Sequence, residues 1–168
     1  MRYRKPNSAP RADILHPYTL VVHNNTLYLI AYCERHAAIR TYALDRLLSA
    51  EWLRGQTFPY PADYRPQQYL DQAFGITVGS PVLVRLKVSD EVVDYFRLRR
   101  WHHSQRMDEG DPGQTYVSLF VPPTAELLSW LLSFGDRIEV LEPVALREKL
   151  RGLSLGIFTL YEGAGGEA

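Results

Sequence analysis

An asparagine pair, Asn24-Asn25, constrains the fold of this chain more than any other feature of its sequence. Apolar runs lie on both sides of the pair, and asparagine tolerates the positive φ angles that a tight turn between two strands requires. The pattern predicts a β-hairpin with strands over residues 18–23 and 26–32. Counting outward from the turn pairs Val21 with Tyr28.

A third strand is expected over residues 38–44, so that the three strands form an antiparallel meander. One side of this strand carries Arg40 and Tyr42, and Arg46 joins them if the strand continues with a bend. Guanidinium groups bind phosphate through paired hydrogen bonds, and a neighbouring ring such as Tyr28 can stack on a base. The third strand therefore predicts a surface for an anionic ligand.

Two further residues, His16 and Tyr18, share a strand face at the start of the hairpin and can line the same surface. A single histidine beside a strand is as often a structural residue with its hydrogen bonds satisfied. For the arginines the alternative is that Arg40 is solvated and that Arg46 pairs with a nearby carboxylate, because exposure is the usual state of arginine.

Four short segments of this region together resemble the WYL domain of bacterial transcriptional regulators. They are His16-Pro17-Tyr18, Leu27-Tyr28-Leu29, Arg40-Thr41-Tyr42 and Asp45-Arg46-Leu47, with Leu27 at the position of the tryptophan that gives the family its name. The resemblance implies a small Sm/SH3-like β-barrel and a ligand-sensing patch. In this chain the patch would comprise His16, Tyr18, Tyr28, Arg40, Tyr42 and Arg46.

The C-terminal half predicts a β-α-β-β-α-β order followed by a helix, which is the ferredoxin-like pattern. The expected elements are a strand at 82–88, a helix capped by Ser89, strands at 101–107 and 114–121, a helix at 125–133 capped by Thr124, a strand at 137–141 and a helix from Pro143 to about Leu150. The segments 130–135 and 138–143 resemble the C-terminal extension, called WCX, that commonly follows WYL domains.

The predicted fold class is therefore mixed α+β, with four parts along the chain. These are a WYL barrel at 1–56, a proline-rich connector with a short helix (67–74) at 57–80, a ferredoxin-like extension at 81–160 and a flexible tail at 161–168. WYL domains normally follow a winged helix-turn-helix, which nothing in this sequence supplies. We therefore expect an N-terminally truncated chain, either a fragment or a natural protein without the DNA-binding part.

Composition narrows the classes of function. The net charge is zero, but residues 1–65 hold nine Lys and Arg against five Asp and Glu, so an anionic partner is expected on the N-terminal half. Cys33 is the only cysteine, and the neighbouring residues His102 and His103 would point to opposite faces of the expected strand, so no metal site is predicted. No membrane span, signal peptide, catalytic motif or cofactor motif is evident, which favours a cytoplasmic protein that is not an enzyme.

The resemblance implies a ligand-sensing effector region of a transcriptional regulator, and what is known of the family implies a nucleotide or single-stranded nucleic acid as the ligand. Contact with duplex DNA would occur only through the missing domain. A homodimer is expected through the open face of the C-terminal sheet, around Val84, His103 and Tyr116. One alternative is a freestanding accessory protein of phage defence that binds RNA or single-stranded DNA and modulates a partner enzyme. The other is a small hydrolase or transferase with an unrecognised site.

Overall fold

The computed structural model describes residues 1–5, 8–110 and 114–162. The chain divides into two compact units, Met1–Leu70 and Asp71–Ala168. Both strands and helices occur, and every sheet is antiparallel, so the expected mixed α+β class is confirmed. No helix of the described residues is long and apolar enough to cross a membrane.

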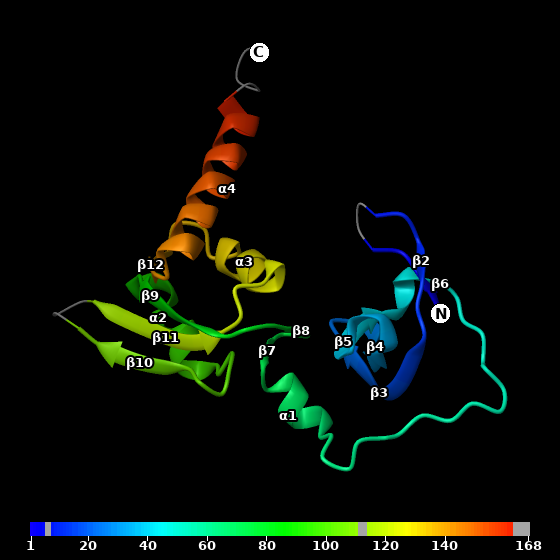
Figure 1. Ribbon diagram of the computed structural model, residues 1–168. Helices are drawn as coiled ribbons and strands as arrows, with labels where there is room; N and C mark the ends of the chain where they lie inside the picture. Colours follow the sequence, from blue (N-terminus) through cyan, green and yellow to red (C-terminus); the bar gives the residue numbers. More distant parts are fainter. Residues whose placement is uncertain (6–7, 111–113, 163–168) are drawn as a thin grey trace. The chain divides into compact units, whose positions relative to one another are not determined.

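The larger sheet of the first unit is built from β3 (Leu15–His23), β4 (Thr26–Cys33) and β5 (Ala38–Ala43), in that order (Figure 1). Asn24 and Asn25 have φ angles of 47° and 60°, and they join β3 to β4. Val21 faces Tyr28 as predicted, so the turn chemistry fixed the register of this hairpin correctly.

A second, smaller sheet has the order β2-β1-β6 and consists of β1 (Arg2–Tyr3), β2 (Arg11–Ala12) and β6 (Leu47–Ser49). Tyr3 packs against Tyr42, Ala31 and Cys33 of the larger sheet, and these four residues form the core of the first unit. No described strand of one sheet pairs with a strand of the other, so the described strands do not close into the barrel that the sequence suggested.

The segment between the last strand of the first unit and the second unit is irregular except for α1 (Pro66–Leu70). The predicted helix at 67–74 is too long, because Ala73–Phe74 forms strand β7 and pairs with β8 (Thr77–Val78). Phe74 is buried in the core of the second unit, and this burial outweighs the helical preference of the segment.

The second unit contains the expected order of strands and helices. Its elements are β9 (Val82–Val88), α2 (Asp90–Leu98), β10 (Arg106–Glu109), β11 (Thr115–Val121), α3 (Ala125–Leu132), β12 (Ile138–Glu142) and α4 (Val144–Glu162). The four strands from β9 onward form a sheet of order β10-β11-β9-β12. Thr124 caps α3 through its side-chain oxygen, which accepts a hydrogen bond from the Leu127 N–H at 3.3 Å.

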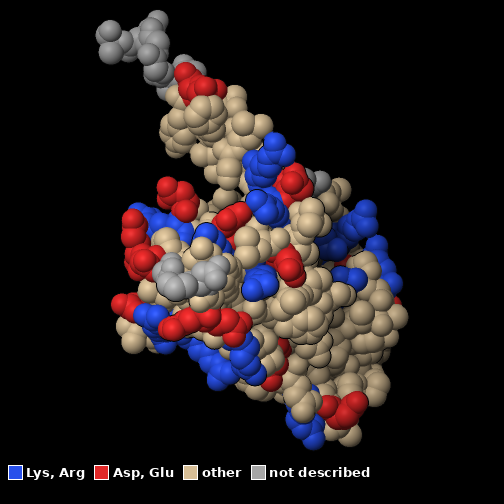
Figure 2. Space-filling view, turned by 90° about the vertical axis from the view of Figure 1, so that its left-hand side faces the viewer, with Lys and Arg blue, Asp and Glu red and all other residues tan. Residues whose placement is uncertain are grey.

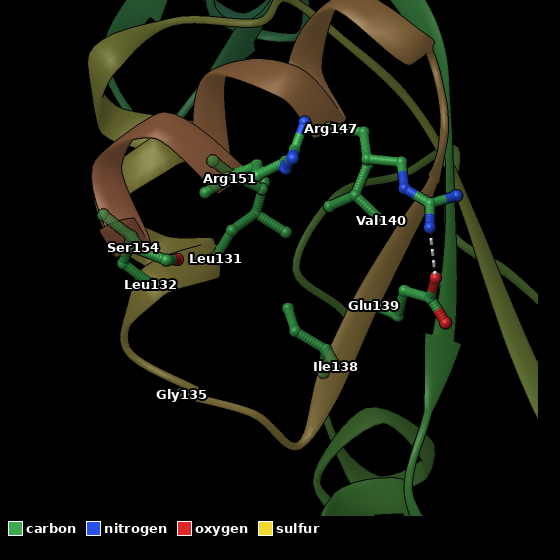
Figure 3. A pocket seen from close by; sticks show the side chains of 10 residues that line it. Leu131, Leu132, Gly135, Ile138, Glu139, Val140, Arg147, Arg151 and Ser154 are labelled. Carbon is green, nitrogen blue, oxygen red and sulfur yellow. Dashed lines mark hydrogen bonds and ion pairs between the residues drawn. The ribbon is translucent and has the colours of Figure 1, made fainter. Parts of the chain in front are cut away.

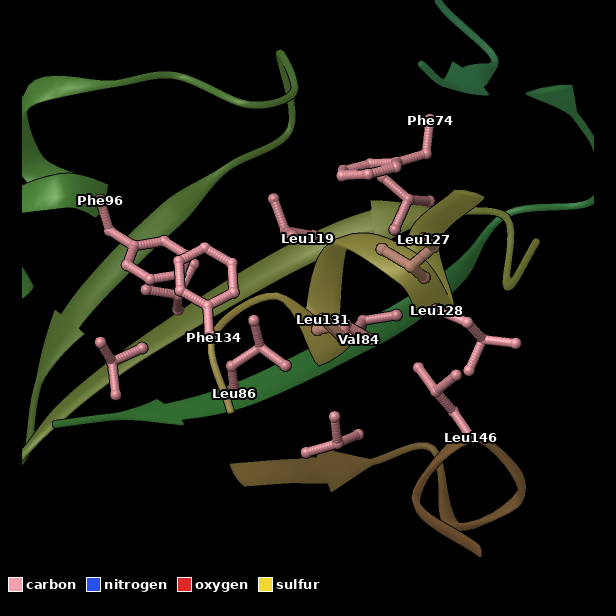
Figure 4. Close-up of a cluster of buried hydrophobic side chains, with 14 of the residues drawn as sticks. Phe74, Val84, Leu86, Phe96, Leu119, Leu127, Leu128, Leu131, Phe134 and Leu146 are labelled. Carbon is pink, nitrogen blue, oxygen red and sulfur yellow. The ribbon is translucent and has the colours of Figure 1, made fainter. Parts of the chain in front are cut away.

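The core of the second unit lies between this sheet and helices α2 and α3 (Figure 4). Alternate residues of β9, including Val84 and Leu86, are fully buried against Phe96 of α2 and Leu131 of α3. The expectation that Val84 lies on the open face of the sheet is therefore wrong. That face instead carries Arg85 and Tyr116. The guanidinium carbon of Arg85 lies 5.0 Å from the centroid of the Tyr116 ring.

The predicted strand at 101–107 is also wrong in its first half. Trp101 begins a turn in which its N–H donates to the Gln105 side chain at 2.9 Å, and that side chain donates to the Phe96 carbonyl at 2.9 Å. His102 and His103 therefore lie in a turn, with ring centroids 4.1 Å apart, rather than on opposite faces of a strand.

Helix α4 extends well beyond its predicted end near Leu150. Tyr161 and Glu162, which were expected in a flexible tail, form its last turn, and residues 163–168 lie outside the described part of the chain. Leu146 is buried in the core of the unit, whereas every residue from Arg151 to Glu162 is exposed.

Candidate ligand-binding surface

The arginine and tyrosine of β5 lie on the face of the larger sheet that carries the core of the first unit. Arg40 is paired with Ala31 and Tyr42 with Leu29. Tyr42 is only 3% exposed, and its ring meets Tyr3 edge-on. Burial, with a further contribution from the Cys33 thiol, raises the pKa of Tyr42 well above its ordinary value. Tyr42 therefore fills the core, and its phenol is not offered to a ligand.

Three of the other predicted residues lie on the opposite face of the same sheet. Tyr28 is paired with Ala43, and His16 is paired with Tyr32, two positions that alternate with those of Leu29 and Ala31 along β4. A register shift between Pro17 and Thr19 interrupts β3 at Tyr18. Five of the six predicted residues are thus divided between two faces, so the six do not form one continuous surface.

The face with His16 and Tyr18 is covered by aromatic residues of the irregular segment that follows β6. Phe58 stacks on His16 with centroids 5.0 Å apart, and Tyr60 and Tyr64 contact Tyr18 at 5.1 and 5.0 Å. We call these five residues the aromatic cluster. Desolvation, followed by the neighbouring Tyr32 and Tyr60, raises the pKa of Tyr18.

His16 also has a polar partner. Its Nε2 lies 3.0 Å from Glu34 Oε1, a carboxylate at the start of the 3-10 helix η1 (Glu34–His36). His16 therefore has structural partners in this unit, and a role of His16 in ligand binding stays a prediction.

Arg40 and Arg46 are exposed, and within the described ranges neither guanidinium forms an ion pair. The strand β5 ends at Ala43, and Arg46 lies in a second 3-10 helix, η2 (Leu44–Arg46), so the strand alternation does not extend to it. The Arg46 carbonyl instead accepts a hydrogen bond from the Arg4 N–H at 3.1 Å, which brings the basic N-terminal residues beside η2.

A group of positive charges surrounds His36. Partial desolvation, followed by the charges of Arg40, Lys5 and Arg35, lowers the pKa of His36, and Asp13 opposes this effect. Arg35 is already paired with Asp13, so its charge is largely neutralised. We define the basic patch as Lys5, His36 and Arg40, whose charges act on one another, together with the exposed Arg46, which the Arg4 hydrogen bond places beside the N-terminal residues.

Lys5 and His36 were not among the residues predicted to bind a ligand. The signal for Lys5 was visible, because Arg2, Arg4 and Lys5 make the N-terminus basic, but the antiparallel pairing of β1 with β6 was needed to place it. Nothing in the sequence joins His36 to Lys5, since the two residues are thirty-one positions apart.

The ring of His102 in the second unit is engaged in hydrogen bonds through both nitrogens. His102 Nδ1 lies 2.7 Å from Ser104 Oγ, and His102 Nε2 lies 3.1 Å from the Asp71 carbonyl. Among the described residues no group of three potential metal ligands comes together.

Comparisons with known proteins agree with the two resemblances in the sequence. A family model of the WYL domain matches residues 1–52, and a family model of the WCX domain matches residues 80–154. An uncharacterized HTH-type transcriptional regulator of Bacillus subtilis (strain 168), YobV, is 26% identical over 155 residues, which is 87% of this chain and 46% of that protein. The chain thus spans about half the length of the curated relative it matches.

Comparison with solved structures gives two further matches, and the first of them supports a similar fold. A CRISPR Cas-related protein has 17% sequence identity and a TM-score of 0.64, covering 98% of this chain and 47% of its own. Proteasome accessory factor B/C of Arthrobacter aurescens has 19% identity and a TM-score of 0.41, covering 89% of this chain and 23% of its own. This chain therefore contains a WYL domain followed by a WCX domain, the two domains that its sequence resembles.

Proposed function

We propose that this chain is a ligand-sensing region of a bacterial transcriptional regulator and binds an anionic ligand on the basic patch. The observation that carries the proposal is the pair of exposed guanidinium groups, Arg40 and Arg46, which form no ion pair within the described residues of a WYL domain. Two such arginines, one of which acts electrostatically on His36 together with Lys5, are available for phosphate oxygens.

The placement of the other predicted residues favours a ligand of several nucleotides over a mononucleotide. His16, Tyr18 and Tyr28 lie on the opposite face of the sheet from Tyr42, so a ligand that reaches them and the basic patch must pass around an edge of the sheet. Phe58 and Tyr60 are partly exposed, and aromatic rings are the usual stacking partners of single-stranded bases. We therefore infer that single-stranded nucleic acid is the better candidate.

We also propose finer fold assignments. The sheet order β10-β11-β9-β12, with two helices on one face, supports a ferredoxin-like second unit. The two small sheets around Tyr3 and Tyr42 support an opened Sm/SH3-like arrangement for the first unit. Homodimerisation, a cytoplasmic location, the absence of catalysis and DNA binding through a further domain belong to the same proposal.

Filter binding of labelled oligonucleotides tests this function. We expect the chain to bind a single-stranded oligonucleotide more tightly than a mononucleotide, and to lose most of this affinity in the double variant Arg40→Ala/Arg46→Ala. A matched control is Arg99→Ala/Arg106→Ala, which removes the same charge from the second unit. Equal affinity of the folded double variant and the control would exclude the basic patch as the site.

The same assay separates the related classes of function. Binding of a mononucleotide alone would favour a small-molecule sensor, and tight RNA or single-stranded DNA binding together with modulation of a partner enzyme would favour an accessory protein. Turnover of a phosphate ester by the chain would contradict the proposal.

A further inference from the structure

The last half of helix α4 is an apolar surface without a partner among the described residues of this chain. Residues 152–161 carry no charge, and they include Leu155, Phe158 and Tyr161 at 64%, 56% and 76% exposure. In Figure 2 the helix stands away from its unit as an uncharged stretch between charged atoms at its base and near its tip. A helix that is apolar on all sides is normally buried, so this surface is built to be covered.

The spacing of the apolar residues indicates another helix as the covering element. Leu146, Leu150, Leu153, Ile157 and Leu160 follow one another at intervals of four, three, four and three residues, which is the heptad spacing of a coiled coil. Leu146 and Leu150 pack against the core of their own unit, whereas Leu153, Ile157 and Leu160 are 41%, 46% and 76% exposed. One continuous stripe therefore has an intramolecular partner for its first half only.

The charges at the two ends of the exposed segment favour a second copy of this chain in antiparallel orientation. Arg151 precedes the uncharged residues and Glu162 follows them. If two α4 helices lie antiparallel, Arg151 of each comes beside the partner's Glu162, and the uncharged residues face each other. A parallel pair would bring like charges together. The i,i+3 contact of Arg151 with Glu148, at 3.4 Å, is exposed and weak enough to be exchanged.

A pocket at the base of the exposed segment lies where the partner's last turn would arrive. Its volume is about 200 Å³, it is open to solvent on one side, and residues of α3, β12 and α4 line it. Leu131, Ile138 and Leu150 supply apolar walls. Arg151 and Ser154 of α4 point toward this space in Figure 3, at the helical positions that an antiparallel partner's Leu160 and Tyr161 would approach.

We propose that two copies of this chain associate through antiparallel α4 helices, each inserting its last turn over the pocket of the other. This interface is separate from the basic patch of the first unit, and it specifies the surface for the homodimerisation that the proposed function includes. It also differs from the open face of the sheet, where charged residues such as Arg85 and Lys87 make a poor apolar contact.

Sedimentation velocity of the full chain between about 1 and 100 µM tests the association. We expect a dimer, and we expect Ile157→Glu to weaken it by about tenfold or more, because a charge replaces a central apolar contact. Leu98→Glu is the matched control, since Leu98, like Ile157, is an exposed aliphatic residue of a helix. It lies in α2 and is 85% exposed. The far-UV circular dichroism of both variants should match that of the unchanged protein.

A charge exchange tests the antiparallel orientation. Arg151→Glu and Glu162→Arg should each weaken the dimer, and the variant with both changes should restore it. A dimer that survives Ile157→Glu, or a double variant without restoration, would overturn the proposal. A chain that stays monomeric at every concentration would do the same. If that monomer sediments with vesicles of phosphatidylcholine and phosphatidylglycerol, the apolar segment binds a lipid surface instead.

Nucleic-acid binding is measured separately on the same samples. Loss of the dimer with unchanged oligonucleotide binding, or the reverse, distinguishes failure of this interface from failure of the proposed function.

Discussion

The ring of Tyr3 meets the ring of Tyr42 edge-on, with centroids 5.2 Å apart and planes at 88°, and this contact joins the two sheets of the first unit. The Tyr3 hydroxyl also accepts a buried hydrogen bond from the Ala43 N–H at 3.1 Å. The Tyr3 side chain thus connects the two-residue strand β1 to the larger sheet. It does so through a ring contact and through a hydrogen bond to a backbone N–H.

We predict that Tyr3→Phe lowers the free energy of unfolding of the first unit by about 1–3 kcal/mol, because it leaves the Ala43 N–H buried without an acceptor. The ring contact with Tyr42 should be kept. Amide hydrogen exchange of β5 measures the effect, with Ala43 expected to lose the most protection. Tyr60→Phe is the control, since Tyr60 is 54% exposed, and a similar loss in both variants would refute the explanation.

Binding of an anion to the basic patch should depend on pH through His36. The pKa of His36 is lowered by partial desolvation and by the charges of Arg40, Lys5 and Arg35. An anionic ligand stabilises the protonated imidazole, so the pKa rises on binding and a proton is taken up. We predict that affinity increases as the pH falls toward the lowered pKa of His36, and that the increase is lost in His36→Gln. Oligonucleotide titrations at several pH values measure this, and an unchanged slope in the variant would contradict it.

Two glycines of the second unit have positive φ angles, 71° at Gly75 and 62° at Gly135, but their surroundings differ. A Cβ at Gly135 meets open space, so Gly135→Ala should cost only the left-handed backbone strain of about 1–2 kcal/mol. A Cβ at Gly75 would collide with the Glu126 carboxylate, which accepts hydrogen bonds from the Ile76 and Thr77 N–H groups at 3.0 and 3.2 Å.

Gly75→Ala should therefore destabilise the unit by about 1.5–3 kcal/mol more than Gly135→Ala, since the displaced carboxylate loses charge-assisted hydrogen bonds. Urea unfolding of the two variants, followed by the fluorescence of the tryptophans near the core, gives the comparison. Equal destabilisation would show that Glu126 moves aside without cost.

Local signals in the sequence were sufficient where one residue type decides the conformation. Asn24 and Asn25 determined the hairpin, and Thr124 caps α3 as predicted, because turns and N-caps depend on few neighbouring residues. Ser89 occupies the N-cap position of α2, but its side chain makes no capping hydrogen bond. The WYL and WCX matches were likewise predictable from short segments.

Contacts between residues far apart in the sequence account for the elements that were predicted wrongly. The strand β7 replaces a predicted helical end because Phe74 packs into the core, and the turn at Trp101 depends on hydrogen bonds from the Gln105 side chain. At the candidate site, alternation along β5 placed Arg40 and Tyr42 together correctly, but their common face became known only from the packing of Tyr3. Sequence periodicity assigns residues to faces without saying what covers each face.

Cys33 is completely buried beneath the small sheet of the first unit, and it is the only thiol of the chain. A thiol reagent can reach it only when β4 separates from its surroundings, so the rate of modification reports how often this unit opens. The rate of Cys33 modification thus measures local opening of the first unit. Ligand binding on the basic patch should lower this rate. Modification of Cys33 at a fixed reagent concentration then reads out occupancy of the patch without a label on either the protein or the ligand.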